Sequence, residues 1–408
     1  MPTLLSVNNY YYPRGGAEVV FLEHNAIFAD AGWRVACFCM EHPDNLPSEW
    51  SRYFIDEIEF GNSYSILEKL RRVPKVVYSF EARRKISELL DQVPADICHL
   101  HNIYHHISPS ILGILREREI PTVLTLHDLK IACPEYHMLS GGKVCERCKG
   151  GNTLNLLLNR CIKHSLALSG VVLLENLVHR MLNSYRDGVS RFVVPSRFYL
   201  EKFVEWGWEE ERFVHVPNFI DSHCFIPRFD AGEEFVYFGR LSGEKGVSTL
   251  IRAAAAAGVG IRIIGGGPDE DSLRELAAET GARATFTGYL RGEPLHEAIR
   301  ASRAVVLPSE WYENAPLSIL ESYALGKPVI AASIGGIPEL IREGETGAVF
   351  SSGSVEQLAH LLGLFRHYSN STLAGMGKAA RAWVEEEFSR ERYHKNMLSL
   401  YRSLGVSC

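Results

Sequence analysis

Apolar runs of strand length alternate with amphipathic helical patterns through nearly all of this chain of 408 residues. Strands that are apolar throughout are buried on both faces, and parallel neighbours need a crossover that a helix usually provides. The alternation therefore predicts an α/β fold in which doubly wound parallel sheets are covered by helices. We expect strands over residues 4–7, 35–39, 97–100, 122–126, 192–194, 213–216, 235–238, 261–264, 284–287, 304–307, 329–331 and 348–350.

The expected strands fall into two series, and the chain is too long for one ordinary core. Proline, glycine and acidic residues gather without periodicity over residues 217–232, as in a linker. We therefore predict an N-terminal domain over residues 1–222 and a C-terminal domain over residues 223–380. Apolar residues at helical spacing predict a terminal helix in the segment 381–408.

Composition limits the class of protein. The formal net charge of −6 argues against a protein that binds nucleic acid. No apolar run is long enough to span a bilayer, and the first residues lack the basic and then apolar pattern of a signal peptide. We therefore expect a cytoplasmic protein whose thiols stay reduced.

Two carboxylates stand eight positions apart in the second domain. Glu313 follows the apolar run 304–307, and Glu321 lies in a helix that a proline can open. Free backbone N–H groups and the helix dipole favour an anion at such a helix start. Acidic residues near the carboxyl ends of strands can also accept hydrogen bonds from sugar hydroxyls. This stretch therefore predicts a site for a phosphorylated ligand that contains a sugar. The residues between the two acids begin with Asn314, Ala315, Pro316 and Leu317.

Two further loops carry groups suited to phosphate. Arg240 and Lys245 follow the first strand of the second domain, in a loop that begins at Gly239. Arg can grip phosphate oxygens in a fork and Lys supplies a point charge, so the pair predicts a diphosphate site; a solvated loop is the alternative. Gly15 and Gly16 follow the first strand of the chain and open a predicted helix. Glycine lets the backbone approach a phosphate closely, although a double glycine also marks a tight turn.

Histidines follow two strands of the first domain. His127 and Asp128 end the strand 122–126, and His101 and Asn102 come at the end of the preceding strand. We expect His127 to point into a cleft, and the group at the end of the preceding strand to form a rim on the side of an acceptor. A purely structural histidine is the alternative for each, and a metal site is a further alternative for the histidine group. That group also includes His99, His105 and His106.

The acidic stretch resembles the Glu-x7-Glu motif of the retaining glycosyltransferases of family four. The resemblance covers about residues 235–350 and implies the GT-B architecture, in which two Rossmann-like domains face each other across a cleft. It also implies that the C-terminal helix packs back on the N-terminal domain. The other segments that carry it are Gly239-Arg240-Leu241, Glu244-Lys245-Gly246, Ile264-Gly265-Gly266-Gly267-Pro268 and Gly335-Gly336-Ile337-Pro338-Glu339.

The resemblance assigns roles to the candidate residues. It implies that Glu313 binds hydroxyls of the donor sugar and that Glu321 binds the ribose. Arg240 and Lys245 would stabilise the departing diphosphate in place of a metal ion, so no catalytic cofactor is expected. His127 would contact the donor sugar. The other implied contacts are Gly15, Gly16, Gly239 and Asn314 to Leu317 with the donor, Gly265, Gly266 and Tyr289 with its base, and His101, Asn102 and Asp128 with the acceptor.

The resemblance implies a retaining transfer of a sugar from a UDP- or GDP-sugar to a hydroxyl. The acceptor would be a saccharide or a lipid-linked glycan, as in polysaccharide or glycolipid assembly. No residue is an obvious nucleophile, and the family reaction proceeds on one face of the sugar, with the leaving phosphate helping to deprotonate the acceptor. Two alternatives remain: a nucleotide-sugar epimerase of the same fold, and a non-catalytic subunit that binds a nucleotide sugar.

Four cysteines in a segment of the first domain suggest a separate structural site. Their spacing is C-x11-C-x2-C-x12-C, and glycines flank the close pair. In a reduced compartment this pattern predicts a closed tetrahedral zinc site with no catalytic role; free thiols with a redox pair are the alternative. The family does not imply this insert, which spans residues 133–161. The predicted ligands are Cys133, Cys145, Cys148 and Cys161.

Basic residues gather in the N-terminal domain from Lys69 to Lys85, with apolar residues between them. Such a stretch can dock on anionic lipid at the inner face of a membrane, although a solvated helix face is the common alternative. Apolar residues over 154–158 and 166–177 add surface that could be exposed or form part of the core.

Overall fold

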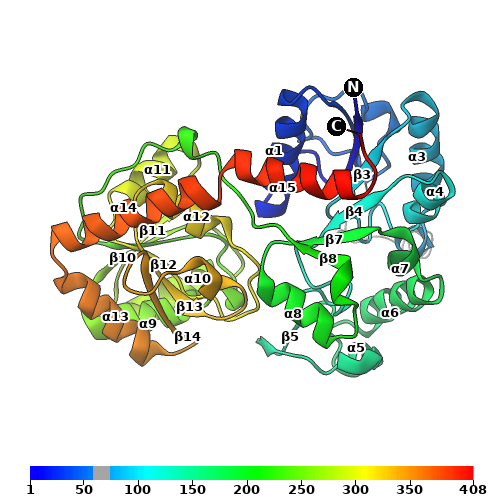
Figure 1. Cartoon of the computed structure of the whole chain (residues 1–408). Helices are drawn as coiled ribbons and strands as arrows, with labels where there is room; N and C mark the ends of the chain where they lie inside the picture. The colour runs from blue at the N-terminus through cyan, green and yellow to red at the C-terminus, as the bar shows by residue number, and fades with distance from the viewer. Residues whose placement is uncertain (58–73, 408) are drawn as a thin grey trace.

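The computed structural model describes residues 1–57 and 74–407, and these form two six-stranded sheets covered by helices (Figure 1). Neighbouring strands within each sheet are parallel. The predicted α/β fold with two doubly wound domains is therefore confirmed. The basic residues Lys69 to Arg72, which contributed to the membrane prediction, lie outside the described residues.

Every predicted strand is present, with ends shifted by at most two residues. In spatial order the first sheet contains β2 (Arg34–Phe38), β1 (Thr3–Val7), β3 (Ile97–Leu100), β4 (Thr122–Thr125), β7 (Arg191–Val194) and β8 (Phe213–His215). The second sheet contains β11 (Arg283–Gly288), β10 (Gly260–Ile264), β9 (Phe235–Phe238), β12 (Val305–Leu307), β13 (Val329–Ser333) and β14 (Gly347–Ser351). A short antiparallel hairpin, β5 (Leu139–Ser140) with β6 (Lys143–Val144), lies in the cysteine-containing insert, where the sequence predicted only a loop.

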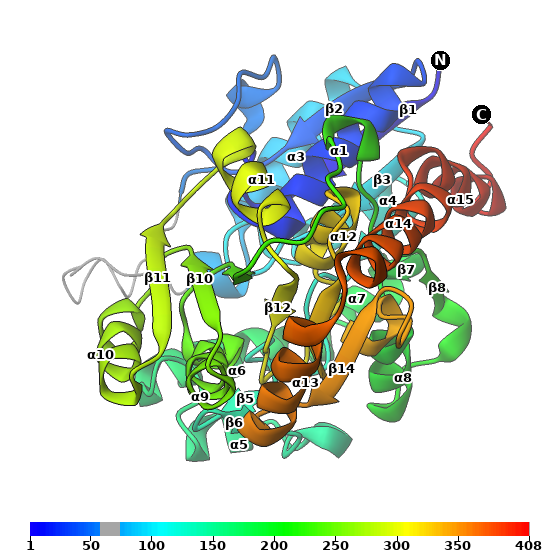
Figure 2. The same cartoon turned by 90° about the vertical axis from the view of Figure 1, so that its left-hand side faces the viewer.

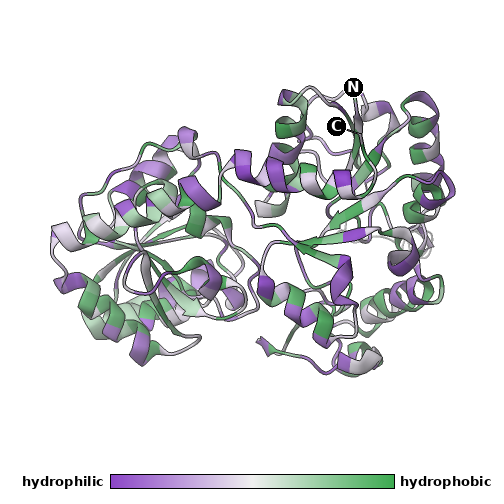
Figure 3. Ribbon diagram, viewed as in Figure 1, coloured by the Kyte–Doolittle hydropathy of each residue, from purple (hydrophilic) through white to green (hydrophobic). Residues whose placement is uncertain are grey.

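Helices connect the strands and cover both sheets. Figure 3 shows green segments along the sheets and a mixture of purple and green along the helices, as expected for helices with one face in the core. In the N-terminal domain they are α1 (Gly16–Asp30), α3 (Phe80–Gln92), α4 (Ile111–Glu117), α5 (Asn155–Leu158), α6 (Leu166–Met181), α7 (Ser184–Gly188) and α8 (Arg197–Glu205). The rest are α9 (Val247–Ala257), α10 (Glu270–Thr280), α11 (Gly292–Arg300), α12 (Leu317–Ala324), α13 (Val355–His367), α14 (Asn370–Glu387) and α15 (Arg390–Ser403).

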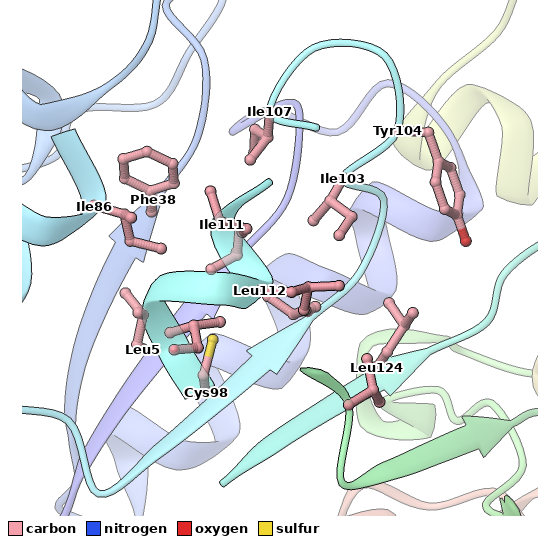
Figure 4. Packing of buried hydrophobic residues seen from close by; sticks show 14 of the residues in the cluster. Leu5, Phe38, Ile86, Cys98, Ile103, Tyr104, Ile107, Ile111, Leu112 and Leu124 are labelled. Carbon is pink, nitrogen blue, oxygen red and sulfur yellow. The ribbon is translucent and has the colours of Figure 1, made fainter. Parts of the chain in front are cut away.

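Successive residues of the first sheet point to opposite faces, and each face has its own core. Leu5 and Cys98 pack with Ile86 of α3 and Leu112 of α4 (Figure 4). Their neighbours in the strands, such as Leu4, join the cluster that also contains side chains of α1 and α15. Strands buried on both faces explain the unbroken apolar runs in the sequence.

The last helix belongs to the N-terminal domain in space, although it follows the C-terminal domain in sequence. Figures 1 and 2 show α14 and α15 running one after the other from the second domain to the first. Arg390, at the start of α15, lies 3.3 Å from Asp30 of α1 and 3.4 Å from Asp221 between the domains. Met397 and Tyr401 are fully buried against α1 and the first sheet. The described part of the chain contains no helix long and apolar enough to cross a membrane.

Candidate active site

The second sheet has its topological switch point between β9 and β12. The strand order runs from β9 through β10 to β11 on one side, and from β12 through β13 to β14 on the other. Loops that leave the carboxyl ends of two such strands diverge and leave a crevice for a ligand. The loop after β9 carries Arg240 and Lys245, and the loop after β12 carries Glu313. The fold thus brings Lys245, one of the two predicted cations, together with the first acid identified from the sequence.

Lys245 and Glu313 form an ion pair at this switch point. The Lys245 Nζ donates to Glu313 Oε1 at 2.7 Å, and the Ser309 hydroxyl donates to the same oxygen at 2.8 Å. The ammonium also lies 4.9 Å from the centre of the Trp311 ring. Burial alone would raise the pKa of Glu313, but Lys245 outweighs burial and holds that pKa below its usual value. The pair is therefore ionised.

Two further charged residues lie near this pair along the chain. The Arg240 side chain is exposed, and its positive charge acts on Tyr136 of the facing domain. Glu321 is half-buried in α12, and burial raises the pKa of its carboxyl to about 7. The site therefore contains one carboxylate that is ionised at neutral pH and one that titrates there.

Glycines allow the loops of the site to pack backbone against backbone. Gly265 has a φ of +137°, and a Cβ there would lie 1.9 Å from the Gly239 carbonyl oxygen. Gly335 has a φ of +61°, and a Cβ there would lie 2.2 Å from the Glu313 carbonyl oxygen. Neither position can hold a larger residue without moving its neighbour. This packing explains why these two glycines accompany the charged residues.

The N-terminal domain presents the start of α1 to the second domain. Gly15 is the N-cap residue and has no side chain to cap the helix, but the Glu18 carboxylate in the first turn accepts a hydrogen bond from its own backbone N–H. A Cβ on Gly16 would lie 3.6 Å from the Leu317 side chain at the start of α12. The two helix N-termini therefore meet across the domain boundary, and the first backbone N–H groups of α1 are suited to an anion.

Hydrogen bonds across the boundary fix the loop that follows Glu313. The Asn314 side-chain amide donates to the Leu126 carbonyl oxygen at 2.9 Å, and its Oδ1 accepts from Ser196 at 2.8 Å. The Asn218 side chain donates to the Ala315 carbonyl oxygen at 2.8 Å. Leu126 directly precedes His127, so this loop is tied to the end of β4. Pro316 is the N-cap residue of α12 rather than its first helical residue.

Several residues of this boundary were not identified from the sequence. Ser196 and Asn218 hold Asn314 and Ala315, and the Glu339 carboxylate accepts hydrogen bonds from the first N–H groups of α8. Ser196 follows β7 closely, so its place after a strand end was a usable signal. Asn218 and Glu339 had no local pattern that indicated a contact between domains.

His127 is half-buried at the end of β4, and its Nε2 lies 2.8 Å from His101 Nδ1. Burial lowers the pKa of His127 to about 4, so the ring is neutral at physiological pH. Burial raises the pKa of the neighbouring Asp128 to about 6, while the Lys130 backbone N–H donates to its Oδ1 at 2.9 Å. Both residues come directly after Leu126, whose carbonyl oxygen accepts the hydrogen bond from Asn314.

The structure corrects the placement of His101. We expected this residue on the acceptor side of a cleft, but its side chain is completely buried. Its ring lies behind His127 and packs against Phe21 and His24 of α1. Asn102 is half-buried, and its side chain acts on Glu18 at the start of α1.

The three residues predicted for the base, Gly265, Gly266 and Tyr289, follow the adjacent strands β10 and β11. Gly266 follows β10 and its carbonyl oxygen accepts from the Leu241 N–H at 3.0 Å. Tyr289 follows β11 and is 66% exposed, with the Arg291 guanidinium 4.8 Å from its ring centre. Both stand at carboxyl ends of the same sheet, although the described contacts do not join Tyr289 to Glu313.

The four cysteines do not form the predicted zinc site. Within residues 1–57 and 74–407, no three His, Cys, Asp or Glu side chains come together in a way that could hold a metal ion. Cys133 packs in the main core of the domain, and Cys161 packs beside Leu156. Burial raises the pKa of Cys133 to about 12 and that of Cys148 to about 11, which favours protonated thiols. The thiols still lie in one region, because the charges of Cys148 and Cys161 act on Cys133 and the charge of Cys145 acts on Cys148 and Cys161.

In the part of the basic stretch that the structure describes, carboxylates of the protein pair with the cations. Arg83 contacts Glu117, Arg84 contacts Glu88 and Lys85 contacts Glu81, so these cations are paired on the protein. Exposed apolar side chains gather instead on and around α5 and α6. They are Leu154, Leu158, Leu166, Leu168, Leu174, Leu177, Met181 and Leu182.

Two family descriptions match most of the chain. Residues 14–223 match "Glycosyltransferase Family 4", and residues 224–383 match "Glycosyl transferases group 1". Among relatives, the Arabidopsis thaliana sulfoquinovosyl transferase SQD2 is 35% identical over 41% of this chain and 35% of its own length. A Mycobacterium tuberculosis enzyme, named as a GDP-mannose-dependent phosphatidylinositol monomannoside mannosyltransferase, is 28% identical over 51% of this chain and 60% of its own. The matches thus span about one to two thirds of these relatives.

Solved structures share the whole fold at lower identity. A sucrose-phosphate synthase from Thermosynechococcus elongatus superposes with a TM-score of 0.73 at 20% identity and covers 99% of each chain. The Anabaena protein Alr3699/HepE, in complex with UDP and glucose, superposes with a TM-score of 0.68 at 19% identity, over 99% of this chain and 100% of its own. At these identities the likeness supports the shared two-domain architecture.

A substitution of Gly335 tests the backbone packing beneath Glu313. We expect Gly335→Ala to lower the thermal midpoint more than Gly344→Ala, because both positions have positive φ but only a Cβ at Gly335 meets backbone. The positive φ should cost each variant about 1 kcal/mol, and overpacking should cost Gly335→Ala roughly 1–3 kcal/mol more. Calorimetry of both variants makes the comparison, and equal midpoints would contradict the close packing.

Proposed function

Since this chain belongs to the family 4, group 1 glycosyltransferases, we propose that it transfers a sugar from a nucleoside diphosphate sugar to a hydroxyl acceptor. The observation that carries the proposal is the Lys245–Glu313 pair at the switch point of the second sheet. Such a crevice suits a nucleotide, and it faces the start of α1, with its glycine N-cap, in the other domain.

We assign the diphosphate to Lys245, Arg240 and the backbone N–H groups at Gly15 and Gly16. In the structure without ligand, Lys245 is held by Glu313 and lies over Trp311. A diphosphate beside this pair would bind the Lys245 ammonium together with Glu313. The Glu313 carboxylate would also accept hydrogen bonds from sugar hydroxyls. Positive groups fixed in advance stabilise the charge that develops on a leaving group. On this proposal the reaction needs no catalytic metal ion.

The donor class is supported by the relatives. The structure of the Anabaena protein contains UDP and glucose, and the mycobacterial relative is named as dependent on GDP-mannose. We therefore propose a UDP- or GDP-sugar, with its ribose at Glu321 and its base along the ends of β10 and β11. Gly265, Gly266 and Tyr289 would form the wall beside the base.

We propose that the transfer proceeds with retention. Glu313 is engaged by Lys245 and Ser309, which makes it a poor nucleophile at the anomeric carbon. His127 has a pKa of about 4, so it supplies a hydrogen bond rather than a positive charge at neutral pH. The acceptor hydroxyl would then attack on the face of the leaving phosphate, which takes up its proton.

The acceptor would bind on the side of the N-terminal domain, beside His127, Asn102 and Asp128. The mycobacterial relative acts on a phosphatidylinositol mannoside by its name, and another solved neighbour is a lipopolysaccharide galactosyltransferase, WaaB, with a TM-score of 0.62 at 17% identity. We therefore propose a saccharide or lipid-linked glycan as acceptor, in polysaccharide or glycolipid assembly.

An epimerase and a non-catalytic subunit remain as alternative functions. An epimerase would consume the nucleotide sugar without an acceptor, so the dependence of turnover on acceptor separates it from a transferase. Arg240, Lys245, Glu313 and Glu321 are all present, which favours an active enzyme over a binding-only subunit.

We also propose contact with the inner face of a membrane through the apolar side chains around α5 and α6. Between residues 150 and 186 the only acid is Glu175, which is buried and paired with Lys130. The same segment contains four Lys and Arg residues: Arg160, Lys163, Arg180 and Arg186. Exposed leucines beside an excess of cations suit an anionic lipid surface.

Removal of the cations tests the diphosphate site. We expect Lys245→Ala and Arg240→Ala each to lower turnover by about 100- to 1,000-fold, because each removes a fixed positive group that stabilises the leaving diphosphate. Turnover should be measured with a UDP- or GDP-sugar, with the thermal midpoint as a check on folding. Lys378→Ala, at an exposed position on α14, is the matched control and should keep full turnover. Comparable turnover in all variants would exclude the assignment.

The titration of Glu321 predicts a pH dependence of donor binding. Ribose hydroxyls donate to the ionised carboxylate, and the folded-state pKa is about 7. Donor affinity should therefore increase as pH rises from 6 to 8, by about tenfold. A nucleotide sugar lacks a terminal phosphate monoester, so its own charge does not change in this range. Calorimetric titration of the wild type and Glu321→Gln should show the pH dependence only in the wild type.

Liposome flotation tests the lipid surface. We expect the protein to float with vesicles that contain anionic phospholipid, and the double variant Leu158→Glu, Met181→Glu to remain in the lower fraction. Both side chains are more than three-quarters exposed, so the change adds charge without disturbing the core. Leu364→Glu, an exposed leucine of α13, is the control and should float like the wild type. Equal flotation of all three proteins would rule out this surface.

A further inference from the structure

Four histidine rings lie one behind another inside the N-terminal domain. The ring centres are 5.1 Å apart between His127 and His101, 4.8 Å between His101 and His99, and 4.4 Å between His99 and His24. They come from the ends of β3 and β4 and from the middle of α1. His24, His99 and His101 are completely buried, and only His127 reaches the boundary between the domains.

The far end of this histidine row is fixed by side chains with defined hydrogen bonds. Tyr393 and Tyr401 of α15 bind the two nitrogens of His24 at 2.9 and 3.2 Å. The Tyr401 hydroxyl also lies 2.5 Å from His99 Nδ1, and the Thr125 hydroxyl lies 2.7 Å from His99 Nε2. Both nitrogens of His24 and of His99 therefore have partners, and the two rings cannot turn freely.

His101 has a different set of contacts. Its Nδ1 lies 2.8 Å from His127 Nε2, while its Nε2 is buried without a hydrogen-bond partner in the described part of the chain. Burial lowers the pKa of both rings, so each is neutral and carries one N–H. Only one of the two facing nitrogens can then hold the hydrogen that joins them.

The unpartnered nitrogen indicates which ring donates. If His127 donated, His101 would have to carry its own hydrogen on Nε2, as a buried N–H without an acceptor. Unpaired buried N–H groups are rarer than unpaired acceptors, and burial of a polar group without a partner is unfavourable. The favoured arrangement has the hydrogen on His101 Nδ1, which donates to His127 Nε2.

We propose that His101 is a positioning residue that holds His127 in the tautomer with its hydrogen on Nδ1. Because His101 donates a hydrogen bond to His127 Nε2, the Nδ1–H of His127 remains available to a ligand. His127 then donates a hydrogen bond to an oxygen of the bound sugar or diphosphate and cannot accept a proton there. This role rests on the proposed glycosyl transfer, but the tautomer itself does not depend on that function.

The tautomer can be observed directly. In the full-length protein labelled with ¹⁵N-histidine, we expect the His127 signals to show a protonated Nδ1 and a bare Nε2 at pH 7. The His127→Gln variant identifies these signals by their absence. A protonated Nε2 on His127 in the wild type would overturn the proposal, whether or not the protein transfers sugar.

Two substitutions at His101 separate positioning from packing. His101→Phe keeps a ring beside His127 but removes the donor, so the His127 signals should shift towards the other tautomer and kcat should fall on the order of 100-fold. The donor KM should change by less than about threefold, because the loss concerns the orientation of a bound group. His101→Asn places an amide donor near the former Nδ1 and should restore most of both readouts. Unchanged signals and kcat in His101→Phe would contradict the role. If His101→Phe fails to fold, the wild-type tautomer still decides.

Discussion

The loop from Glu313 to Ala315 is held by both domains at once, and the rest of the site depends on this constraint. From below, Gly335 brings its backbone within a few ångströms of the Glu313 backbone. From the side, Lys245 and Ser309 bind the Glu313 carboxylate. From the other domain, Leu126 accepts a hydrogen bond from Asn314. One short loop therefore sets the position of the acid, of the start of α12 and, through β4, of His127. Its buried charge is tolerable because Lys245 lies at hydrogen-bond distance.

The N-terminal domain adds a neutral histidine and a carboxyl group that titrates near pH 6 to this arrangement. Burial lowers the pKa of His127 and raises that of Asp128. Near pH 6 each side chain is therefore less charged than the same side chain in water. The second domain instead contains an ionised pair and the exposed Arg240. The two sides of the boundary thus differ in charge. On the proposed function, a charged donor meets the cationic loop, and an uncharged hydroxyl meets the neutral histidine.

Much of this architecture could be predicted from the sequence, because strands buried on both faces leave unbroken apolar runs. The same logic located Lys245, Glu313 and His127, since each follows such a run. It failed for His101, which also follows a run but is completely buried against Phe21 and His24 of α1. The cysteine spacing predicted a zinc site, but among the described residues no three possible ligands are grouped closely enough to hold a metal ion. Contacts between distant segments, such as Asn218 with Ala315, leave no local pattern to detect.

The return of α15 has a consequence for synthesis on the ribosome. Tyr401 fills the core between α1 and the first sheet, yet it is translated only after the second domain. Domains generally fold in the order in which they emerge, but here the first domain would emerge with one face of its core open. His24, His99 and Leu4 would stay accessible until the second domain and then α15 have been made. A nascent chain of this protein therefore presents an apolar surface to chaperones for the whole time that residues 223–389 are being added.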